Sequence, residues 1–419
     1  MLDIKYIREN VEQVKEEIKN RHMKVDVDLL LEFDVQKREI GGQIDELRAA
    51  RNKGSKGKPS EEEIAEMKRI GEEIKTLEEK AKEINEKYTE ILLQVPNKTH
   101  KDSPIGGEED YKVIHVNKEP QIFEFQPKDH EELLTNLGAL DFERGAKVVG
   151  SKFYFSKNNL VKLNRALISY GIDVAEKYGF ELIETPDLAK IDVLVGAGFN
   201  PRGDEDQIYT IENTDFALIG TAEITTLGYH ANETLDLSNG PIKYLAISHC
   251  FRKEAGAYGR TSKGLYRVHQ FTKLEMFVFC KPEESDAMHA ELLQIEKEIA
   301  DGLDIPYRVI DIPTGDLGAP AYRKYDLEAY MIMKGDENKQ GDYGEITSTS
   351  NCLDYQARRL NIKYENEEGK KEFVHTLNGT AVVLSRFPIV LIENNQNKDG
   401  SVHIPEVLQK YMGGKTKIG

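Results

Sequence analysis

The stretch FRKEAGAYGRTSKGLYRVHQFTKLEMF, residues 251–277, holds the side chains best suited to chemistry. Basic residues gather here, although the chain as a whole carries a net charge of −17. Residues two apart on a strand share a face, and Arg252 and Glu254 have this spacing. Further along the same stretch, an even spacing relates Arg267, Phe271, Lys273 and Glu275. Each half of the stretch therefore presents charged groups on one face.

These residue types point to a nucleotide beside an amino group. Guanidinium groups suit bidentate contacts with phosphate, a ring such as Phe271 suits stacking on a base, and Glu275 suits an ammonium group. Cross-strand ion pairs and a ring in the core are the plainer interpretation of the same residues. The chain contains no GxxxxGK[ST] sequence, so a nucleotide is not held by a P-loop.

The elements that must position these groups follow from the pattern after residue 120. Strand-like runs occupy 243–251, 265–271, 273–280 and 381–394, so residues 243–252 and 265–279 read as a long hairpin around a polar loop. Helical patterns occupy 159–178 and 283–303. Because the strands cluster without regular βαβ alternation, residues 121–419 are expected to form a mixed, mostly antiparallel α+β domain. Residues 99–120 read as a linker.

Residues 1–98 are nearly all helical in pattern. Apolar or long side chains recur at steps of three and four from Leu30 to Arg51 and again from Ile64 to Ile91, which predicts a heptad seam on each helix. Ser60 and Glu63 have the spacing of a capping box that starts the second helix. The two helices are therefore expected to form an antiparallel coiled-coil arm, roughly 50 Å long at 1.5 Å per residue.

The tip of this arm, residues 47–58, carries basic residues and no acid, whereas the second helix is rich in Glu. A basic tip on an acidic arm suggests contact with a phosphate backbone. The residues concerned are Arg48, Arg51, Lys53, Lys56 and Lys58. A dimerisation element, a spacer or a merely solvated loop remains the alternative.

The composition excludes several classes of protein. The net charge and a pI near 5.2 argue against a generally basic protein that coats nucleic acid. No apolar run approaches about 18 residues, so no membrane span is expected, and the first residues lack the apolar centre of a signal peptide. The three widely spaced cysteines argue against a disulfide framework and a zinc site. We expect a soluble cytoplasmic protein.

The stretch FRKEAGAYGRTSKGLYRVHQF resembles motif 2 of the seryl-tRNA synthetases, which are class II aminoacyl-tRNA synthetases. Further resemblances follow in chain order. KYGFELIETP (177–186) is similar to motif 1, IGTAEIT (219–225) to the serine-binding loop, GEITSTSNCLDYQARR (344–359) to the metal and ATP strand, and LNGTAVVLSRFPIVLIENNQ (377–396) to motif 3. The N-terminal hairpin resembles the tRNA-binding arm of that family.

The resemblance implies an enzyme that activates L-serine with ATP to seryl-adenylate and transfers serine to tRNA(Ser). It implies a homodimer and Mg²⁺, the metal held by Glu345 and Ser348. The serine contacts it implies are Thr221, Ala222, Glu223, Arg252, Glu275, Asn378 and Thr380. The ATP contacts it implies are Arg252, Lys253, Glu254, Arg267, Val268, Phe271, Glu345, Ile346, Thr347, Ser348 and Arg386.

Three departures from the family pattern stand out, at Thr380, Ala381 and Pro388. Pro388 is expected to bend a strand or to end its pairing, and residues 333–344 read as an insertion. Two alternatives stay open: an adenylating paralog that loads another acceptor, and an inactive tRNA-binding scaffold. The sequence leaves open whether selenocysteine tRNA, tRNA(Sec), is a second substrate.

Overall fold

The computed structural model describes residues 1–54, 60–199, 207–254 and 263–419. The chain divides into two compact units, Met1–Lys98 and Thr99–Gly419. Among the helices of the described residues, none is long and apolar enough to cross a membrane.

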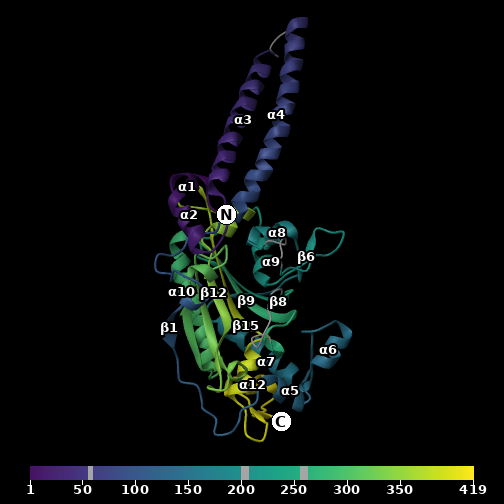
Figure 1. Cartoon of the computed structure of the whole chain (residues 1–419), viewed down its shortest axis with the longest axis vertical. Helices are drawn as coiled ribbons and strands as arrows, with labels where there is room; N and C mark the ends of the chain where they lie inside the picture. Colours follow the sequence, from purple (N-terminus) through teal and green to yellow (C-terminus); the bar gives the residue numbers. More distant parts are fainter. Residues whose placement is uncertain (55–59, 200–206, 255–262) are drawn as a thin grey trace. The chain divides into compact units, whose positions relative to one another are not determined.

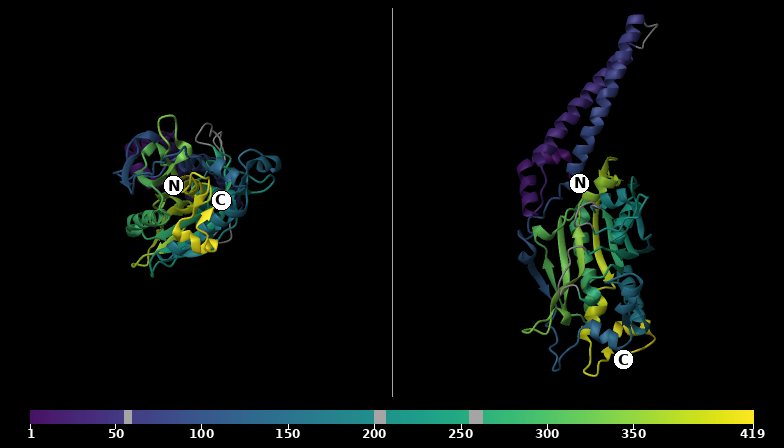
Figure 2. Two further views of the ribbon diagram at one scale, coloured as in Figure 1. Left: turned by 90° about the horizontal axis from the view of Figure 1, so that it is seen from below. Right: turned by 45° about the vertical axis from the view of Figure 1, so that its right-hand side comes forward.

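The first unit consists of helices α1 (Ile4–Glu9), α2 (Val11–Asn20), α3 (Val27–Gly54) and α4 (Glu61–Gln94). The long helices α3 and α4 lie side by side as the predicted hairpin (Figures 1 and 2). The Ser60 hydroxyl accepts from the Glu63 amide at 3.2 Å, and the Glu63 carboxylate accepts from the Ser60 amide at 2.7 Å. This reciprocal pair satisfies two backbone donors that the helix start leaves open, as the capping box predicts.

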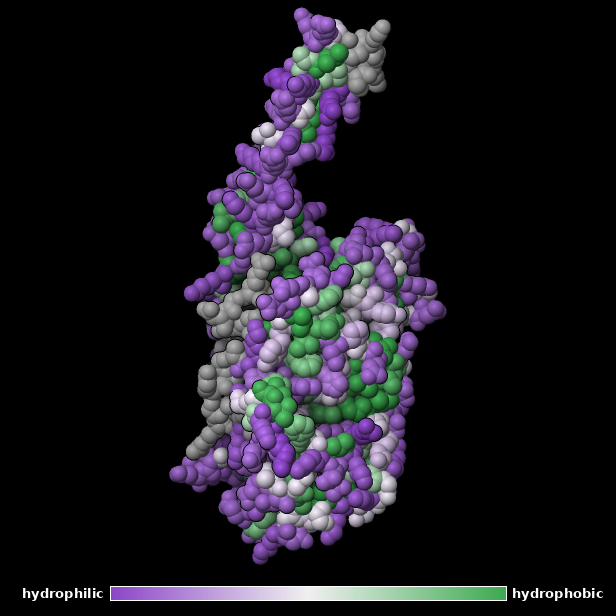
Figure 3. Space-filling view, turned by 90° about the vertical axis from the view of Figure 1, so that its right-hand side faces the viewer, coloured by the Kyte–Doolittle hydropathy of each residue, from purple (hydrophilic) through white to green (hydrophobic). Residues whose placement is uncertain are grey.

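Apolar side chains of the predicted seam hold the hairpin together. Ile40 and Ile44 of α3 are buried against Ile84 of α4. The Lys37 ammonium, also on the seam, lies 4.3 Å from the centroid of the Tyr88 ring. The outer surface of the hairpin is mainly hydrophilic in Figure 3, which fits helices that bury only one stripe each.

The second unit is built on a sheet that has eight strands within the described residues. Its order is β1 (Lys112–Val116), β10 (Tyr307–Asp311), β11 (Arg323–Met331), β12 (Asp342–Asn351), β15 (His375–Val383), β9 (Gln270–Cys280), β8 (Ile242–Phe251) and β4 (Glu181–Glu184). All neighbours pair antiparallel except β4 and β8, which are parallel. The predicted α+β class with a mixed, mostly antiparallel sheet is therefore confirmed.

The helices described in this unit are α5 (His130–Asn136), α6 (Phe142–Val148), α7 (Asn158–Glu176), α8 (Ile191–Ala197), α9 (Ala222–Tyr229), α10 (Ser285–Gly302), α11 (Tyr355–Leu360), α12 (Phe387–Asn394) and α13 (Glu406–Gln409). Of these, α7, α10 and α12 pack on one face of the sheet, and α8, α9 and α11 pack on the other. Short strands complete the unit: β2 (Leu140–Asp141), β3 (Phe155–Ser156), β5 (Leu188–Lys190), β6 (Phe216–Leu218), β7 (Thr234–Leu235), β13 (Lys363–Glu365), β14 (Lys371–Phe373), β16 (Val402–His403) and β17 (Lys417–Ile418).

The central strand β9 separates two hydrophobic clusters. Leu274 and Met276 pack in the cluster that includes residues of α7, α10 and α12. Phe277 and Phe279 pack in the cluster that includes residues of α8, α9 and α11. Since side chains alternate along a strand, Glu275 shares a face with Phe277. The functional groups of β9 therefore lie on the sheet face that α8, α9 and α11 cover.

Three predicted segments differ in the structure. Residues 112–116 of the expected linker form edge strand β1, which pairs with β10. Residues 264–266 form a 3₁₀ turn, η3 (Gly264–Tyr266), and β9 begins only at Gln270. The run 381–394 splits into the end of β15, a turn and helix α12.

Pro388 therefore stands in the first turn of helix α12 and not within a strand. Proline is well tolerated there because the first helical amides have no acceptor within the helix. A short apolar run fits a buried strand and a buried helix equally well, so the pattern at 381–394 was not decisive. The bend expected at Pro388 is in fact the start of a new element.

Candidate active site

A cavity of about 330 Å³ opens at the junction of β8, β9, β12 and β15. Its walls are mostly polar. They are formed by Phe199, Thr221, Glu223, Arg252, Glu254, Tyr266, Val268, Phe271, Lys273, Glu275, Lys324, Glu345, Ile346, Ser348, Asn378, Thr380, Val383, Ser385 and Arg386. Most residues expected in the serine and ATP sites thus come together in one place.

One end of the cavity is an acidic floor. Glu223 lies in the first turn of α9, and its Oε1 accepts from Gln356 Nε2 at 2.6 Å and from Asn378 Nδ2 at 3.0 Å. Glu275 of β9 pairs with Lys273 Nζ at 2.7 Å. Thr221 caps α9, its hydroxyl accepting from the Glu223 amide at 3.3 Å. Each carboxylate is therefore held in a fixed orientation.

Burial raises the pKa of both acids. Burial, followed by the nearby charge of Glu275, raises the pKa of Glu223 to about 7. Burial also raises the pKa of Glu275, although the charge of Lys273 opposes this. Two carboxylates in one poorly solvated place disfavour double ionisation. The floor therefore lacks one positive charge, which a ligand ammonium group would supply.

Thr380 adds a hydroxyl to this floor, since its Oγ1 donates to Glu275 Oε2 at 3.3 Å. The pairing of β15 with β9 shifts between Thr380 and Val382. This bulge places Val383, three residues after Thr380, in the cavity wall as well. Asn378, Thr380 and Val383 consequently line one side of the same cavity.

Arg252 lies beyond the end of β8. Its Nε and Nη2 donate to the Gly220 carbonyl at 3.4 and 3.3 Å, and its guanidinium carbon lies 5.4 Å from the centroid of the Phe271 ring. The carbonyl is an uncharged partner, so the guanidinium keeps its full charge toward the cavity. An anion there can form the strong, bidentate contacts that arginine offers.

Tyr266 and Arg386 form the opposite wall. The Arg386 guanidinium lies 3.7 Å from the centroid of the Tyr266 ring, and its Nη1 donates to the Glu345 carbonyl at 2.8 Å. Lys334 Nζ lies 4.8 Å from the same ring. A flat cation held against a ring suits contact with a base or a phosphate.

Glu345 and Ser348 both line the cavity although they are three residues apart on β12. The pairing of β11 with β12 shifts between Leu327 and Glu328, so Ile346 is an extra residue in β12. A bulge of this kind re-aims the side chains that follow it. A carboxylate and a hydroxyl are thereby brought to one face.

These two groups fit a hard cation. Enclosure opposes ionisation of Glu345, but the charges of Arg386, Lys324 and Arg252 lower its pKa below the usual range, so it is an anion at neutral pH. Carboxylate and hydroxyl oxygens are suitable Mg²⁺ ligands, and Mg²⁺ retains water and substrate phosphates as its other ligands. In the part of the chain that the structure describes, no group of three or more His, Cys, Asp or Glu residues could hold a metal ion without other ligands.

Four expected site residues lie outside the cavity wall: Ala222, Lys253, Arg267 and Thr347. Arg267 Nη1 instead pairs with Glu254 Oε2 at 3.2 Å. Thr347 Oγ1 donates to the buried Glu296 at 2.9 Å. The bulge at Ile346 explains the second case, because it turns Ser348 toward the cavity and Thr347 away from it.

The expected list also omits several residues of the site. Lys273 carries the ion pair to Glu275, and its spacing of two from both Phe271 and Glu275 was a usable signal. Tyr266 supports Arg386 and lies within the motif 2 stretch. Gln356, which holds Glu223, is on a helix 133 residues away along the chain, and no local pattern could have paired them.

The basic tip of the arm is only partly described. Arg48 pairs with Glu78 of the opposite helix at 2.8 Å, and Arg51 is exposed. Arg48, Arg51, Asn52, Met67 and Lys68 line a shallow groove on this unit. Lys53 lies near the end of α3, whereas Lys56 and Lys58 fall outside the described residues, as does Arg260 of the motif 2 loop.

Comparisons with known proteins agree along the whole chain. Residues 1–99 match the family model of the seryl-tRNA synthetase N-terminal domain, and residues 208–395 match that of the class II tRNA synthetase core domain (G, H, P, S and T). The chain is 50% identical to the serine–tRNA ligase of Treponema denticola over 422 residues, covering 99% of each chain.

Solved structures give the same result. The seryl-tRNA synthetase of Pyrococcus horikoshii complexed with ATP has a TM-score of 0.90 and 39% identity, covering 100% of this chain and 99% of the other. The cytoplasmic serine–tRNA ligase of Naegleria fowleri in complex with AMP has a TM-score of 0.86 and 35% identity, covering 100% and 98%. With a curated relative half identical over its full length, the chain belongs to the seryl-tRNA synthetases, a family of aminoacyl-tRNA ligases.

Proposed function

We propose that the chain activates L-serine with ATP to seryl-adenylate and then transfers the seryl group to tRNA(Ser). One observation carries this proposal. A single cavity holds an acidic floor of Glu223 and Glu275 at one end and the cations Arg252 and Arg386 with Glu345 at the other. The acidic floor complements the ammonium group of an amino acid, and the cations complement the phosphates of a nucleoside triphosphate. The ATP and AMP complexes of the structural relatives support the same assignment.

In the first step a serine carboxylate oxygen forms a bond to the α-phosphorus while the bond to the pyrophosphate oxygen breaks. The substrates supply both the nucleophile and the leaving group, so the protein has to align two anions and stabilise the charge that develops. Arg252 is suited to contact both the carboxylate and the α-phosphate. A cation that follows the moving charge favours the transition state over the bound substrates.

The other end of ATP would lie between Phe271, Glu254 and Arg386. Glu254 would accept from the adenine amino group, and Phe271 would stack on the base. Arg386, already flat against Tyr266 at 3.7 Å, would contact the other face of the base or a phosphate. Glu345 and Ser348 would hold Mg²⁺, which would neutralise part of the phosphate charge.

The serine pocket would select its substrate through the side-chain hydroxyl. Thr221, Glu223 and Glu275 face the amino group in this proposal, and Asn378 and Thr380 face the hydroxyl. A pocket whose polar groups are satisfied only by that hydroxyl rejects alanine more strongly than shape alone can. The methyl group of Thr380 narrows the same space, which works against threonine.

The transfer step requires tRNA, for which the arm is the proposed contact. The basic groove of Arg48, Arg51 and Lys68 suits an RNA backbone, and shape-based recognition of a helical RNA needs no base-specific side chain. A homodimer is also proposed. Edge strand β4 exposes Leu182 and β5 exposes Leu188, each by more than 40%, and Figure 3 shows hydrophobic patches on the surface of this unit.

ATP–pyrophosphate exchange with serine, and separately with alanine, threonine or cysteine in its place, tests the first step. Charging of tRNA(Ser) tests the second. Exchange with serine followed by charging is the expected result. Exchange without charging would indicate the adenylating paralog. Absence of exchange with every amino acid would indicate a tRNA-binding scaffold. Charging of tRNA(Sec) transcripts in the same assay decides whether that RNA is a second substrate.

A further inference from the structure

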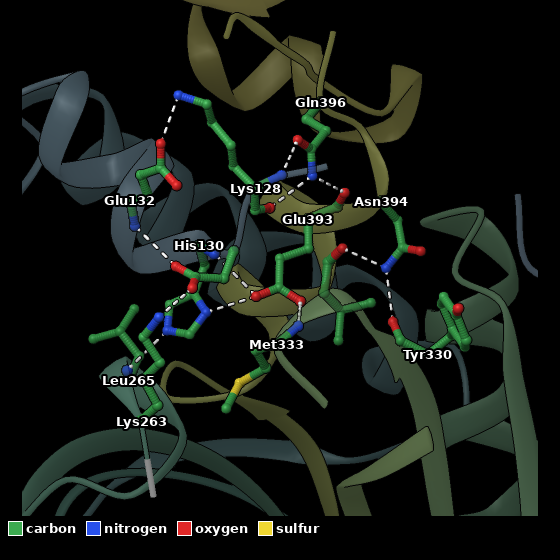
Figure 4. A network of polar contacts seen from close by, with 12 residues as sticks. Lys128, His130, Glu132, Lys263, Leu265, Tyr330, Met333, Glu393, Asn394 and Gln396 are labelled. Atoms are coloured by element: carbon green, nitrogen blue, oxygen red, sulfur yellow. Dashed lines mark hydrogen bonds and ion pairs between the residues drawn. The ribbon is translucent and has the colours of Figure 1, made fainter. Parts of the chain in front are cut away.

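A fully buried hydrogen-bonded pair lies outside the cavity wall and joins four segments of the second unit. Glu393 is on α12 and His130 begins α5, and both side chains are completely inaccessible to solvent. Glu393 Oε1 lies 2.7 Å from His130 Nδ1 and accepts from the His130 amide at 2.9 Å. Figure 4 shows this pair at the centre of a network of polar contacts.

The contacts of His130 define which ring nitrogen carries hydrogen. The Leu265 amide donates to Nε2 at 3.0 Å, so Nε2 is the acceptor and Nδ1 donates to Glu393. The second oxygen of Glu393 accepts from the Met333 amide at 3.1 Å. Through Glu393 and His130 together, α12 is thus fixed to α5, to η3 and to the 3₁₀ turn η6 (Ile332–Lys334).

Three of these four segments each carry one member of a cation–ring stack, of which Tyr266 and Arg386 line the cavity. Leu265 precedes Tyr266, Met333 precedes Lys334, and Arg386 is the residue from which α12 starts. Arg386 and Lys334 both lie against the Tyr266 ring, at 3.7 and 4.8 Å. The buried pair therefore holds the three backbones whose side chains form the cation–ring stack.

The local backbone is built around this contact. Gly264 has a φ of +56°, and a Cβ at this position would lie 2.1 Å from His130 Nε2. A side chain at position 264 is thus excluded both by the left-handed conformation and by the imidazole. Just outside the buried pair, Lys263 forms an ion pair with Asp129, which precedes His130. Residues 263–265, which lead from the motif 2 loop to β9, therefore each contact Asp129 or His130.

We propose that His130 and Glu393 are positioning residues for the nucleotide, which hold Tyr266, Lys334 and Arg386 at the spacing that ATP requires. The proposal deepens the proposed function and rests on it. The pair touches neither substrate in this scheme. It acts through backbone amides, so its loss should weaken ATP binding and leave the serine floor, built from other elements, unchanged.

The sharpest variant is His130→Asn. The Asn amide can still donate to Glu393 in place of Nδ1, but it leaves the buried Leu265 amide without its acceptor. An unpaired buried amide commonly changes an equilibrium by about tenfold. We expect the KM for ATP in the exchange assay to rise about tenfold while the KM for serine stays within about twofold. Glu393→Gln, which keeps the shape and removes the charge, should shift the KM for ATP in the same direction.

His289→Asn is the matched control. His289 is also buried and its Nε2 contacts the Thr349 carbonyl at 3.1 Å, but it carries no contact to the stack. It should lower the melting temperature without changing the ratio of the two KM values. ATP should also raise the melting temperature of His130→Asn less than that of the native protein.

The outcomes are distinguishable. If the native protein shows no serine-dependent exchange, the proposed function fails. If it does, and His130→Asn and Glu393→Gln raise both KM values equally or neither of them, the pair is a purely structural contact and the positioning proposal is overturned.

Discussion

The serine pocket should titrate near neutral pH, and Glu223 is the group responsible. Burial raises the pKa of its carboxyl to about 7, so this carboxyl is half ionised at neutral pH in the free protein. The charged groups facing it are Glu275, Lys273 and Arg252. Only the ionised form pairs with the ammonium of serine. The ionised fraction rises from roughly a tenth at pH 6 to roughly nine-tenths at pH 8, so the KM for serine should fall by about tenfold.

The same group destabilises the free protein as the pH rises. The unfolded chain releases this proton near 4.5, whereas the folded chain retains it up to about 7. The contribution of Glu223 to the free energy of unfolding is therefore fully present below pH 4.5. It declines as the pH rises from 4.5 to about 7, by about 3 kcal/mol in total. Serine, which supplies the missing positive charge, should restore part of this loss.

Glu223→Gln isolates the charge. The amide oxygen at position 223 can still accept from Gln356 and Asn378, so the geometry of the floor is preserved. We expect serine binding to weaken strongly, the pH dependence of the KM for serine to disappear, and the free variant to be more stable than the native protein at pH 8.

Initial rates of pyrophosphate exchange between pH 6 and 8 give the KM for serine, and the KM for ATP at the same pH values is the internal control. Calorimetry in two buffers of different ionisation enthalpy should also record proton release on serine binding at pH 6.5. A KM for serine that does not change with pH in the native protein, or that changes equally in Glu223→Gln, would refute the reasoning.

Three further predictions concern the other groups. Arg252→Ala should reduce exchange by about a thousandfold and leave tRNA affinity, measured by filter binding, within about twofold, because Arg252 is not on the arm; loss of both would contradict this division. Glu345→Gln should raise the Mg²⁺ concentration for half-maximal exchange about tenfold or more, and an unchanged Mg²⁺ titration would remove Glu345 as a ligand. Gln at the five basic tip positions should spare exchange, cut charging of tRNA(Ser) and flatten the salt dependence of tRNA binding; unchanged charging would make the tip a solvated loop. The positions are Arg48, Arg51, Lys53, Lys56 and Lys58.

The sequence by itself determined the features that depend on neighbours along the chain. The capping box of Ser60 and Glu63 and the seam of the hairpin follow from local spacing, and both are present as predicted. The alternation along β9 placed Phe271 and Glu275 in one cavity for the same reason, since a strand has a period of two. Motif order along the chain indicated the family before any contact was known.

Only the tertiary structure decided the features that depend on distant partners. The bulge at Ile346 exists because β12 must pair with β11, and it alone brings Glu345 and Ser348 to one face. The run at 381–394 becomes a strand and a helix because its second half packs against other elements, which an apolar pattern does not specify. Gln356 on Glu223 and His130 on Glu393 join residues 133 and 263 positions apart. Such pairs leave no local pattern, because they depend on how the chain folds back on itself.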